Sequence, residues 1–194
     1  MTDEEDVLVA VRGRLAEVPE FVVPGGFVVR EMDPDDAEDV DRWLAVHNAA
    51  FGRSWTPENF RLGMTENPVV LVDRVYLAER ASEAVGTASA GRFRRSPETG
   101  VGHYLAVHPS VQGLGLALAL CALRYRALAH AGLVWGESQT HAHRIGSLRV
   151  HFRCGFVPKN GIDPWNSIVP RDGPLREQAD ARLREEYAAW RSGR

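Results

Sequence analysis

The stretch that decides the fold is VHPSVQGLGLAL, residues 107–118. It lies between a predicted strand at 102–107 and a predicted helix from about 114 to 131. Its two glycines, Gly113 and Gly115, fall where the chain enters the helix. The first backbone N–H groups of a helix have no partner within it, and the helix dipole adds positive character there. Because glycine lets an anion come close to the backbone, the stretch predicts a cradle for a pyrophosphate.

Two common phosphate-binding motifs do not fit this loop. The Walker pattern GxxxxGK[ST] is absent. The Rossmann pattern fails because Leu118 stands where its third small residue belongs, and no acidic residue follows about 20 positions on. A tight strand-to-helix turn without a ligand is the alternative interpretation.

Outward from the loop, strands and helices follow in a regular order. Along the chain we expect a strand at 27–32, a helix begun by Asp33 and Pro34, a shorter helix begun by Thr56 and Pro57, a hairpin of strands at 75–79 and 84–93, the strand at 102–107, the long helix, a strand at 133–138 and a helix at 144–153. This order predicts an α/β (α+β) domain with a mixed sheet.

The two ends of the chain are predicted to lie outside this domain. Val7, Val11, Leu15 and Val18 recur at three- and four-residue steps, which predicts a helical arm within residues 1–24. The domain itself would cover 25–170, and a last helix would occupy 171–194. The apolar faces of the two terminal helices could pack on the domain or form a homodimer interface.

The quoted stretch resembles the acyl-CoA-binding motif of the GNAT superfamily of N-acetyltransferases. That motif reads Gln/Arg-x-x-Gly-x-Gly/Ala after a strand that ends Val-x-Pro, and here it is Gln112 to Ala117 after Val107-His108-Pro109. SLRVHFRCGF (147–156) resembles the second motif of the family, a helix that ends in Gly-Phe. The resemblance covers residues 27–158. It implies the GNAT fold, in which helices flank a mixed central sheet that is splayed at the acyl-CoA site.

The resemblance also implies acetyl-CoA as co-substrate and no metal. The backbone of Leu105, Ala106 and Val107 would pair with the pantetheine arm as if with an extra strand. The N–H groups of the loop would hold the pyrophosphate, at Gln112, Gly113, Leu114, Gly115, Leu116 and Ala117.

The catalytic groups follow from the same resemblance. A primary amine would attack the thioester, with a base for its proton and an acid for the leaving thiolate. Many members use a tyrosine as acid where this chain has His151, whose histidinium could serve near neutral pH, or which could simply pack in the helix. Where some relatives place a basic glutamate, this chain has Val101, so His103 or Glu98 is the nearest titratable substitute. Some members need no dedicated base.

Charged residues near the expected acceptor pocket allow several interpretations. The run from Glu31 to Asp41 holds seven carboxylates, which could attract a cationic amine or could complement a helix start. Arg144 stands where many members have an asparagine, and it could reach a phosphate or an acidic acceptor, or be solvated. The H-x-H spacing of His141 and His143 and the H-x-x-C spacing of His151 and Cys154 resemble those of metal ligands, but no second cysteine pair supports a zinc site.

Composition limits the partners. The chain has 194 residues and a formal net charge of −3, which removes the usual electrostatic argument for nucleic-acid binding. No apolar run approaches the ~18 residues of a membrane span, and MTDEED at the start is unlike a secretory signal. We therefore expect a cytoplasmic acyl-CoA-dependent N-acetyltransferase acting on a small-molecule amine. A protein or peptide N-acetyltransferase and a non-catalytic acyl-CoA sensor are the alternatives.

Overall fold

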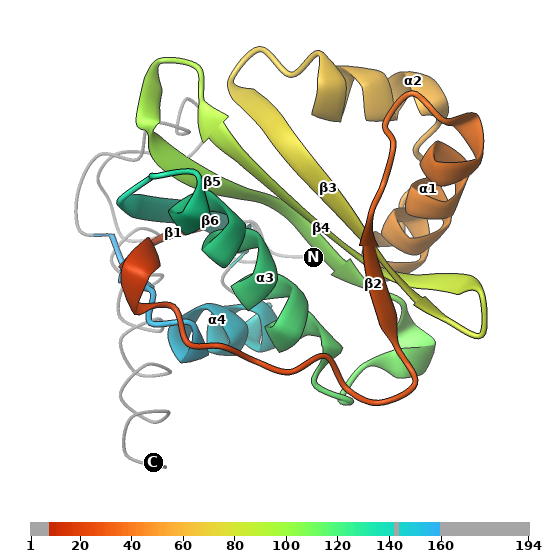
Figure 1. Cartoon of the computed structure of the whole chain (residues 1–194). Helices are drawn as coiled ribbons and strands as arrows, with labels where there is room; N and C mark the ends of the chain where they lie inside the picture. Colours follow the sequence, from red (N-terminus) through yellow and green to blue (C-terminus); the bar gives the residue numbers. More distant parts are fainter. Residues whose placement is uncertain (1–7, 142–143, 160–194) are drawn as a thin grey trace, which may run out of the picture.

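A seven-stranded sheet forms the centre of the molecule in the computed structural model, which describes residues 8–141 and 144–159 (Figure 1). Its strand order is β2-β3-β4-β5-β6-β1-β7, and all neighbouring pairs are antiparallel except β5 and β6, which are parallel. The strands are β1 (Leu8–Arg14), β2 (Val28–Glu31), β3 (Val70–Arg80), β4 (Glu83–Phe93), β5 (Ser96–Val107), β6 (Trp135–His141) and β7 (Val157–Pro158). The predicted mixed sheet is confirmed.

Four α-helices cover the sheet. They are α1 (Ala37–Phe51), α2 (Pro57–Phe60), α3 (Leu116–His130) and α4 (Ile145–Arg153). In Figure 1, α1 and α2 lie on one face of the sheet, α3 lies on the opposite face, and α4 packs beside α3. No helix in the described part of the chain is long and apolar enough to cross a membrane.

Local sequence signals explain where the first helices begin and end. Asp36, rather than Asp33, caps α1, and its side chain accepts a hydrogen bond from the Glu38 N–H (3.0 Å). The helix ends at Gly52, whose φ of 60° is in the left-handed region that glycine adopts readily. A capping box at Thr56 begins α2, as the Thr-Pro pair predicts.

The predicted N-terminal helical arm is wrong for the described residues, because residues 8–14 form strand β1 inside the sheet. β1 pairs with β6 along its whole length and with β7 through Val11 and Arg12. Val9 and Val11 also fit a period of two, and short apolar runs do not distinguish helix from strand. Pairing with the edge of β6 decides that residues 8–14 form a strand rather than a helix. The predicted helix at 171–194 lies outside the described residues.

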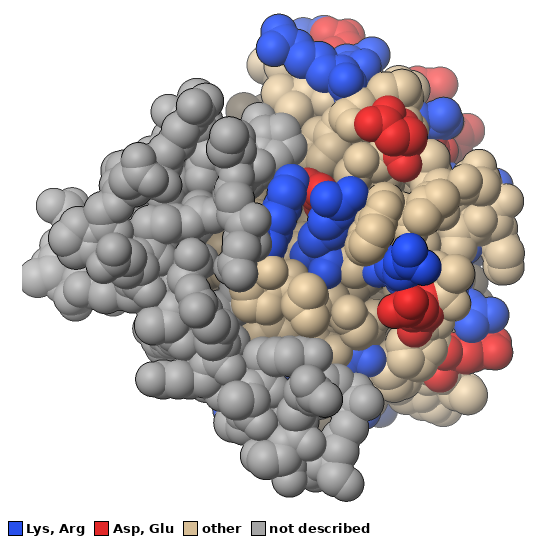
Figure 2. Space-filling model, turned by 90° about the vertical axis from the view of Figure 1, so that its left-hand side faces the viewer, with Lys and Arg blue, Asp and Glu red and all other residues tan. Residues whose placement is uncertain are grey.

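Among the described residues, three apolar clusters hold the helices on the sheet. One packs Trp43 and Phe60 of the first helices against β3, a second packs α3 and α4 against β1, and a third packs α3 against β4. Cys121 and Cys154 are buried in the second cluster as free thiols. On the surface shown in Figure 2, basic and acidic side chains of the described residues are interspersed, without a broad patch of either sign.

Candidate active site

The sheet opens into a fork between β5 and β6. The two strands pair only from Thr99 to Val101, opposite Trp135 to Glu137, and β5 then continues to Val107 without β6 beside it. The Ser138 Oγ donates a hydrogen bond to the Gly102 carbonyl (3.0 Å) at the point where the strands part. The predicted splay of the sheet is therefore present, and it lies next to the glycine loop.

An outer groove of about 610 Å³ runs from the fork to the glycine loop. Eight of the nine residues predicted to contact acyl-CoA line it, namely Leu105, Ala106, Val107, Gln112, Gly113, Gly115, Leu116 and Ala117. The ninth, Leu114, does not line the groove and its side chain is 50% exposed. The sequence thus identifies the residues of one continuous surface feature.

The loop that closes this groove is built for a close approach to its backbone. Gly113 and Gly115 have φ values of 80° and 86°, which other residues adopt only with strain. A Cβ on Gly113 would have no heavy atom within 4 Å, so the space in front of the loop is open. Gly115 is the N-cap of α3 and offers no side-chain cap, so the first N–H groups of this long helix face the groove unpaired by a side chain. An anion is the partner that such a helix start favours.

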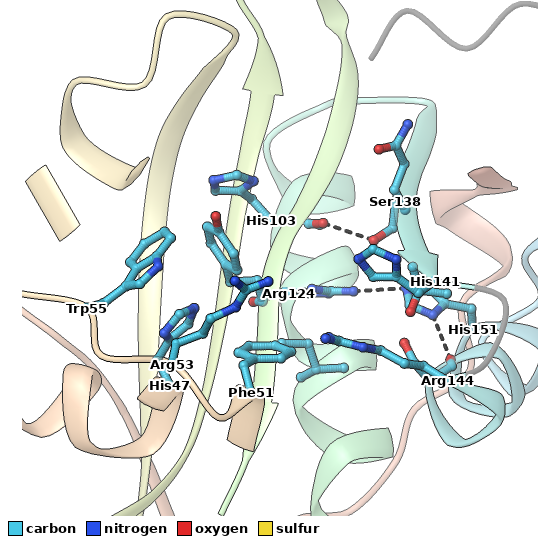
Figure 3. Close-up of a pocket in the computed structure, with 16 residues that line it drawn as sticks. His47, Phe51, Arg53, Trp55, His103, Arg124, Ser138, His141, Arg144 and His151 are labelled. Carbon is cyan, nitrogen blue, oxygen red and sulfur yellow. Dashed lines mark hydrogen bonds between the residues drawn. The ribbon is translucent and has the colours of Figure 1, made fainter. Parts of the chain in front are cut away.

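An inner cavity of about 470 Å³ lies on the other side of the fork (Figure 3). Phe51, Leu105, Arg144 and Ser147 line both the cavity and the groove, so the two spaces meet there. Side chains from α1, the loop after it, β5, β6, α3 and α4 form the walls, including His47, Arg53, Trp55, His103, Tyr104, Arg124, Ser138, His141 and His151.

A β-bulge at Tyr104 shapes the cavity. His103 pairs with Ser89 and Leu105 with Ala88, which leaves Tyr104 as an extra residue with a φ of 45°. Successive side chains of a regular strand point to opposite faces, but a bulge re-aims them. Here His103 and Tyr104 both line the cavity, with ring centroids 4.4 Å apart. Burial raises the pKa of Tyr104, so the phenol keeps its proton at neutral pH.

His103, the candidate base, is buried, and its Nε2 donates to the Gly63 carbonyl (2.9 Å). Burial lowers the pKa of His103 to about 4, and the charge of Arg124 acts in the same direction. The ring is therefore neutral at neutral pH. That is the state a base needs, although so low a pKa makes the ring weakly basic.

His151, the candidate acid, also lines the cavity but is held as a neutral ring. Its Nδ1 donates to the Ser147 carbonyl (2.8 Å), and its Nε2 accepts from the Arg124 Nη2 (3.1 Å). Burial, together with the charge of Arg124, lowers the pKa of His151 to about 3. In this environment His151 is not protonated near neutral pH, so it does not fit the predicted role of a histidinium acid.

The acidic run lies away from the cavity, contrary to the hypothesis that it attracts the amine. Asp39 accepts from the Arg30 guanidinium (2.9 Å) and from the Asp33 N–H (2.9 Å), and Asp36 caps α1. Asp35 and Asp41 border a separate surface hollow at the start of α1. No residue from 31 to 41 lines the inner cavity. Asp36 and Asp39 therefore stabilise the start of α1.

Two other sequence interpretations concern Glu98 as a base and a metal site, and His143 of the metal interpretation lies outside the described residues. Val101 is fully buried and Glu98 is exposed, and neither lines the cavity. Within residues 8–141 and 144–159, no group of three His, Cys, Asp or Glu side chains could hold a metal ion. Arg53, Arg124 and Tyr104, which the sequence did not single out, are part of the cavity. Of these three, only Arg124 could have been noticed in the sequence, because it is an arginine on the apolar face of the helix that forms α3.

Comparison with known proteins gives the family. The family model described as the acetyltransferase (GNAT) family matches residues 40–156, more than half of the chain. This chain belongs to the GNAT acetyltransferase family. The matched span of this GNAT domain includes the fork, the glycine loop and α4, and thus both the groove and the cavity.

Individual relatives agree with this assignment. The chain is 31% identical over 158 residues to the mycothiol acetyltransferase of Thermomonospora curvata, which covers 78% of this chain and 52% of that protein. It thus spans about half the length of this curated relative. A GCN5-related N-acetyltransferase from Sphaerobacter thermophilus superposes with a TM-score of 0.64 at 23% identity, over 80% of this chain and 49% of that one. The diaminobutyrate acetyltransferase of Paenibacillus lautus, solved with L-2,4-diaminobutyric acid and coenzyme A, gives 0.50 at 23% identity, over 64% and 71%.

Proposed function

We propose that this GNAT protein transfers an acetyl group from acetyl-CoA to the primary amine of a small molecule. The observation that carries the proposal is the meeting of two spaces at the fork. The outer groove ends at a helix start suited to an anion, and the inner cavity is walled by six different segments. One space can take the cofactor and the other the acceptor, with the reacting atoms where they join.

The groove would hold acetyl-CoA through backbone atoms. The unpaired edge of β5 at Leu105 to Val107 would form hydrogen bonds with the amides of the pantetheine arm. The N–H groups of the loop from Gln112 to Ala117 would bind the pyrophosphate. Gln112 Nε2 donates to the Val107 carbonyl (3.2 Å), which ties the loop to the end of the strand.

The reaction is a direct transfer. The amine nitrogen attacks the thioester carbonyl carbon, a C–N bond forms, the C–S bond breaks, the amine loses a proton and the thiolate gains one. We propose Tyr104 as the proton donor to the thiolate, because it lines the cavity and stays protonated. His103, neutral and adjacent to Tyr104, remains our candidate acceptor of the amine proton, directly or through water.

His151 is better suited to positioning than to acid catalysis. It anchors the Arg124 guanidinium, whose Nη1 in turn lies 3.5 Å from the Tyr104 carbonyl. This chain of contacts connects α4 and α3 to the bulge. We propose that His151 keeps Arg124, and through it the backbone of Tyr104, in place.

Acetyl transfer to a panel of small amines tests the proposal. Release of free CoA thiol is followed spectroscopically, and the product is identified by mass spectrometry, with reactions lacking the acceptor as control. We expect at least one amine to be acetylated at a rate well above hydrolysis. The buried Val101, which leaves the strand without a carboxylate, favours the alternative of a non-catalytic acyl-CoA sensor. Tight CoA binding with no turnover of any amine would support that alternative.

A further inference from the structure

The charged side chains that line the inner cavity are all of one sign among the described residues. Arg53, Arg124 and Arg144 line it together with four histidines, and none of the sixteen described residues in its lining is a carboxylate. Elsewhere in the described residues several arginines form ion pairs, for example Arg30 with Asp39, Arg61 with Glu58 and Arg92 with Asp73. Within the described ranges, none of the three cavity arginines has such an ion pair.

Two of these arginines face each other across the cavity. Arg53 comes from the loop after α1 and Arg144 from the residue before α4, and they extend into the space from opposite sides (Figure 3). Arg144 lies over the Phe51 ring, with its guanidinium carbon 4.7 Å from the ring centroid, which fixes its direction. Burial lowers the pKa of Arg144, and the charge of Arg53 contributes to the lowering. An anion bound between two like charges replaces their repulsion with attraction to both.

The third arginine already has its own partners. The Arg124 guanidinium binds the His151 Nε2 (3.1 Å) and the Tyr125 hydroxyl (3.3 Å), and it is buried beneath Gly102. It therefore adds positive potential to the floor of the cavity, while Arg53 and Arg144 have guanidinium groups to offer a ligand.

We propose that the acceptor carries a carboxylate in addition to its amine, and that Arg53 and Arg144 bind this carboxylate. This inference rests on the proposed function and narrows its substrate class. Arg144 also borders the groove, but Arg53 lines only the inner cavity, on the far side of the fork from the glycine loop. The anion bound between them therefore belongs to the acceptor rather than to the phosphates of CoA.

The placement also assists the reaction. The rings of His47, Phe51 and Trp55 line the cavity, and the Phe51 and Trp55 rings lie tilted against His47 with centroids 4.8 and 4.4 Å away. This aromatic wall would contact the carbon skeleton of the acceptor. An ammonium group beside the cavity arginines loses its proton more easily, because nearby positive charges disfavour the protonated form. The guanidinium groups thus attract one end of the acceptor and help to make its amine nucleophilic.

Matched pairs of acceptors test this inference. The probes are free L-amino acids and the corresponding L-amino acid amides, which differ only in the carboxylate. We expect kcat/KM for the preferred amino acid to exceed that for its amide at least about tenfold, mainly through KM, as for a charged hydrogen-bonded contact. In Arg53→Gln and Arg144→Gln this ratio should fall toward one. Arg95→Gln, an exposed arginine away from the cavity, should keep the ratio of the unchanged protein.

Equal use of acids and amides, or an unchanged ratio in both cavity variants, would overturn the inference. If neither these probes nor any amine of the wider panel is acetylated, the proposed function fails, and calorimetric titration of the same pairs decides the inference separately. Binding of an amino acid that is lost in its amide and in Arg53→Gln supports a carboxylate site without catalysis. No preference for the acid in that titration overturns it.

Discussion

Tyr104 illustrates how one residue gives the cavity its character. Its positive φ depends on β4 and β5 pairing out of register by one residue, and nothing in the local run GHYLAV indicates that. A regular strand places His103 and Tyr104 on opposite faces, so the sequence predicts only one of them in the site. The glycines of the loop are the opposite case, since their residue type alone predicts their backbone conformation.

Removing the hydroxyl of Tyr104 tests the role of this residue as proton donor. Tyr104→Phe keeps the ring that contacts Trp55 and His47 and removes only the hydroxyl. We expect kcat to fall about 10²-fold, the usual scale of general acid catalysis, while acetyl-CoA affinity stays the same. Tyr76→Phe, which removes the hydroxyl of a buried tyrosine on β3 outside both spaces, is the matched control. An unaltered kcat in Tyr104→Phe would assign the ring to packing.

A negative charge introduced at position 115 should weaken cofactor binding. Gly115→Asp and Gly115→Asn put side chains of nearly equal size at the start of α3, and both must accept a φ of 86°. Asn tolerates the left-handed region, so the pair separates charge from strain. We expect Asp to weaken CoA affinity at least tenfold more than Asn in calorimetry, because only Asp repels the pyrophosphate. Equal losses would indicate strain alone and contradict the cradle.

The buried histidines should make the fold sensitive to mild acid. Unfolded histidine titrates near pH 6.5, whereas burial lowers the pKa of His151 to about 3 and that of His103 to about 4. The unfolded chain therefore binds more protons in this window. The free energy of unfolding therefore has its full value above about pH 6.5 and falls as the pH drops toward the pKa values of the folded state.

The corresponding measurement is urea unfolding at pH 7 and pH 5. The unchanged protein should lose about 2 kcal/mol more free energy of unfolding over this interval than His151→Gln, which lacks the titrating ring. His130→Gln, at an exposed position, should behave like the unchanged protein. Equal losses in the unchanged protein and His151→Gln would show that His151 titrates normally.

At the scale of elements, local signals predicted most of the fold. The hairpin of β3 and β4, the helix starts at Thr56 and Gly115, and the end of α4 near Gly155 follow from caps, turns and glycines. β1 could not be predicted in this way, because its strand conformation depends on the edge of β6, more than 120 residues later. Apolar spacing in a seven-residue run was ambiguous between the two conformations.

A substitution in β1 tests its place in the core. Val11 is 0% exposed between β6 and β7, so Val11→Ala should lower the free energy of unfolding by about 2 kcal/mol through lost burial and a cavity. Val22→Ala, at a side chain that is 88% exposed, should change it by less than about 0.5 kcal/mol. Thermal or urea unfolding measures both, and equal effects would mean that residues 8–14 are not part of the core.

At the scale of the whole molecule, the two spaces differ in how far the sequence predicts them. The groove consists mainly of one continuous stretch around the glycine loop, and eight of its seventeen described lining residues are among the predicted acyl-CoA contacts. The cavity gathers side chains from α1, β5, β6, α3 and α4, so it depends on packing that no single segment encodes. The hypothesis of a homodimer depended on the apolar faces of two predicted terminal helices. Because residues 8–14 form strand β1, the first of these helices is absent from the described residues.

The most direct test of the account is a crystal structure of the full chain with acetyl-CoA bound. We predict that the pantetheine arm lies along Leu105 to Val107, that the pyrophosphate contacts the N–H groups between Gln112 and Ala117, and that the acetyl group lies at the fork beside Tyr104. Acetyl-CoA bound outside the groove, or an acetyl group turned away from the inner cavity, would contradict the proposal that the groove binds the cofactor and the cavity binds the acceptor.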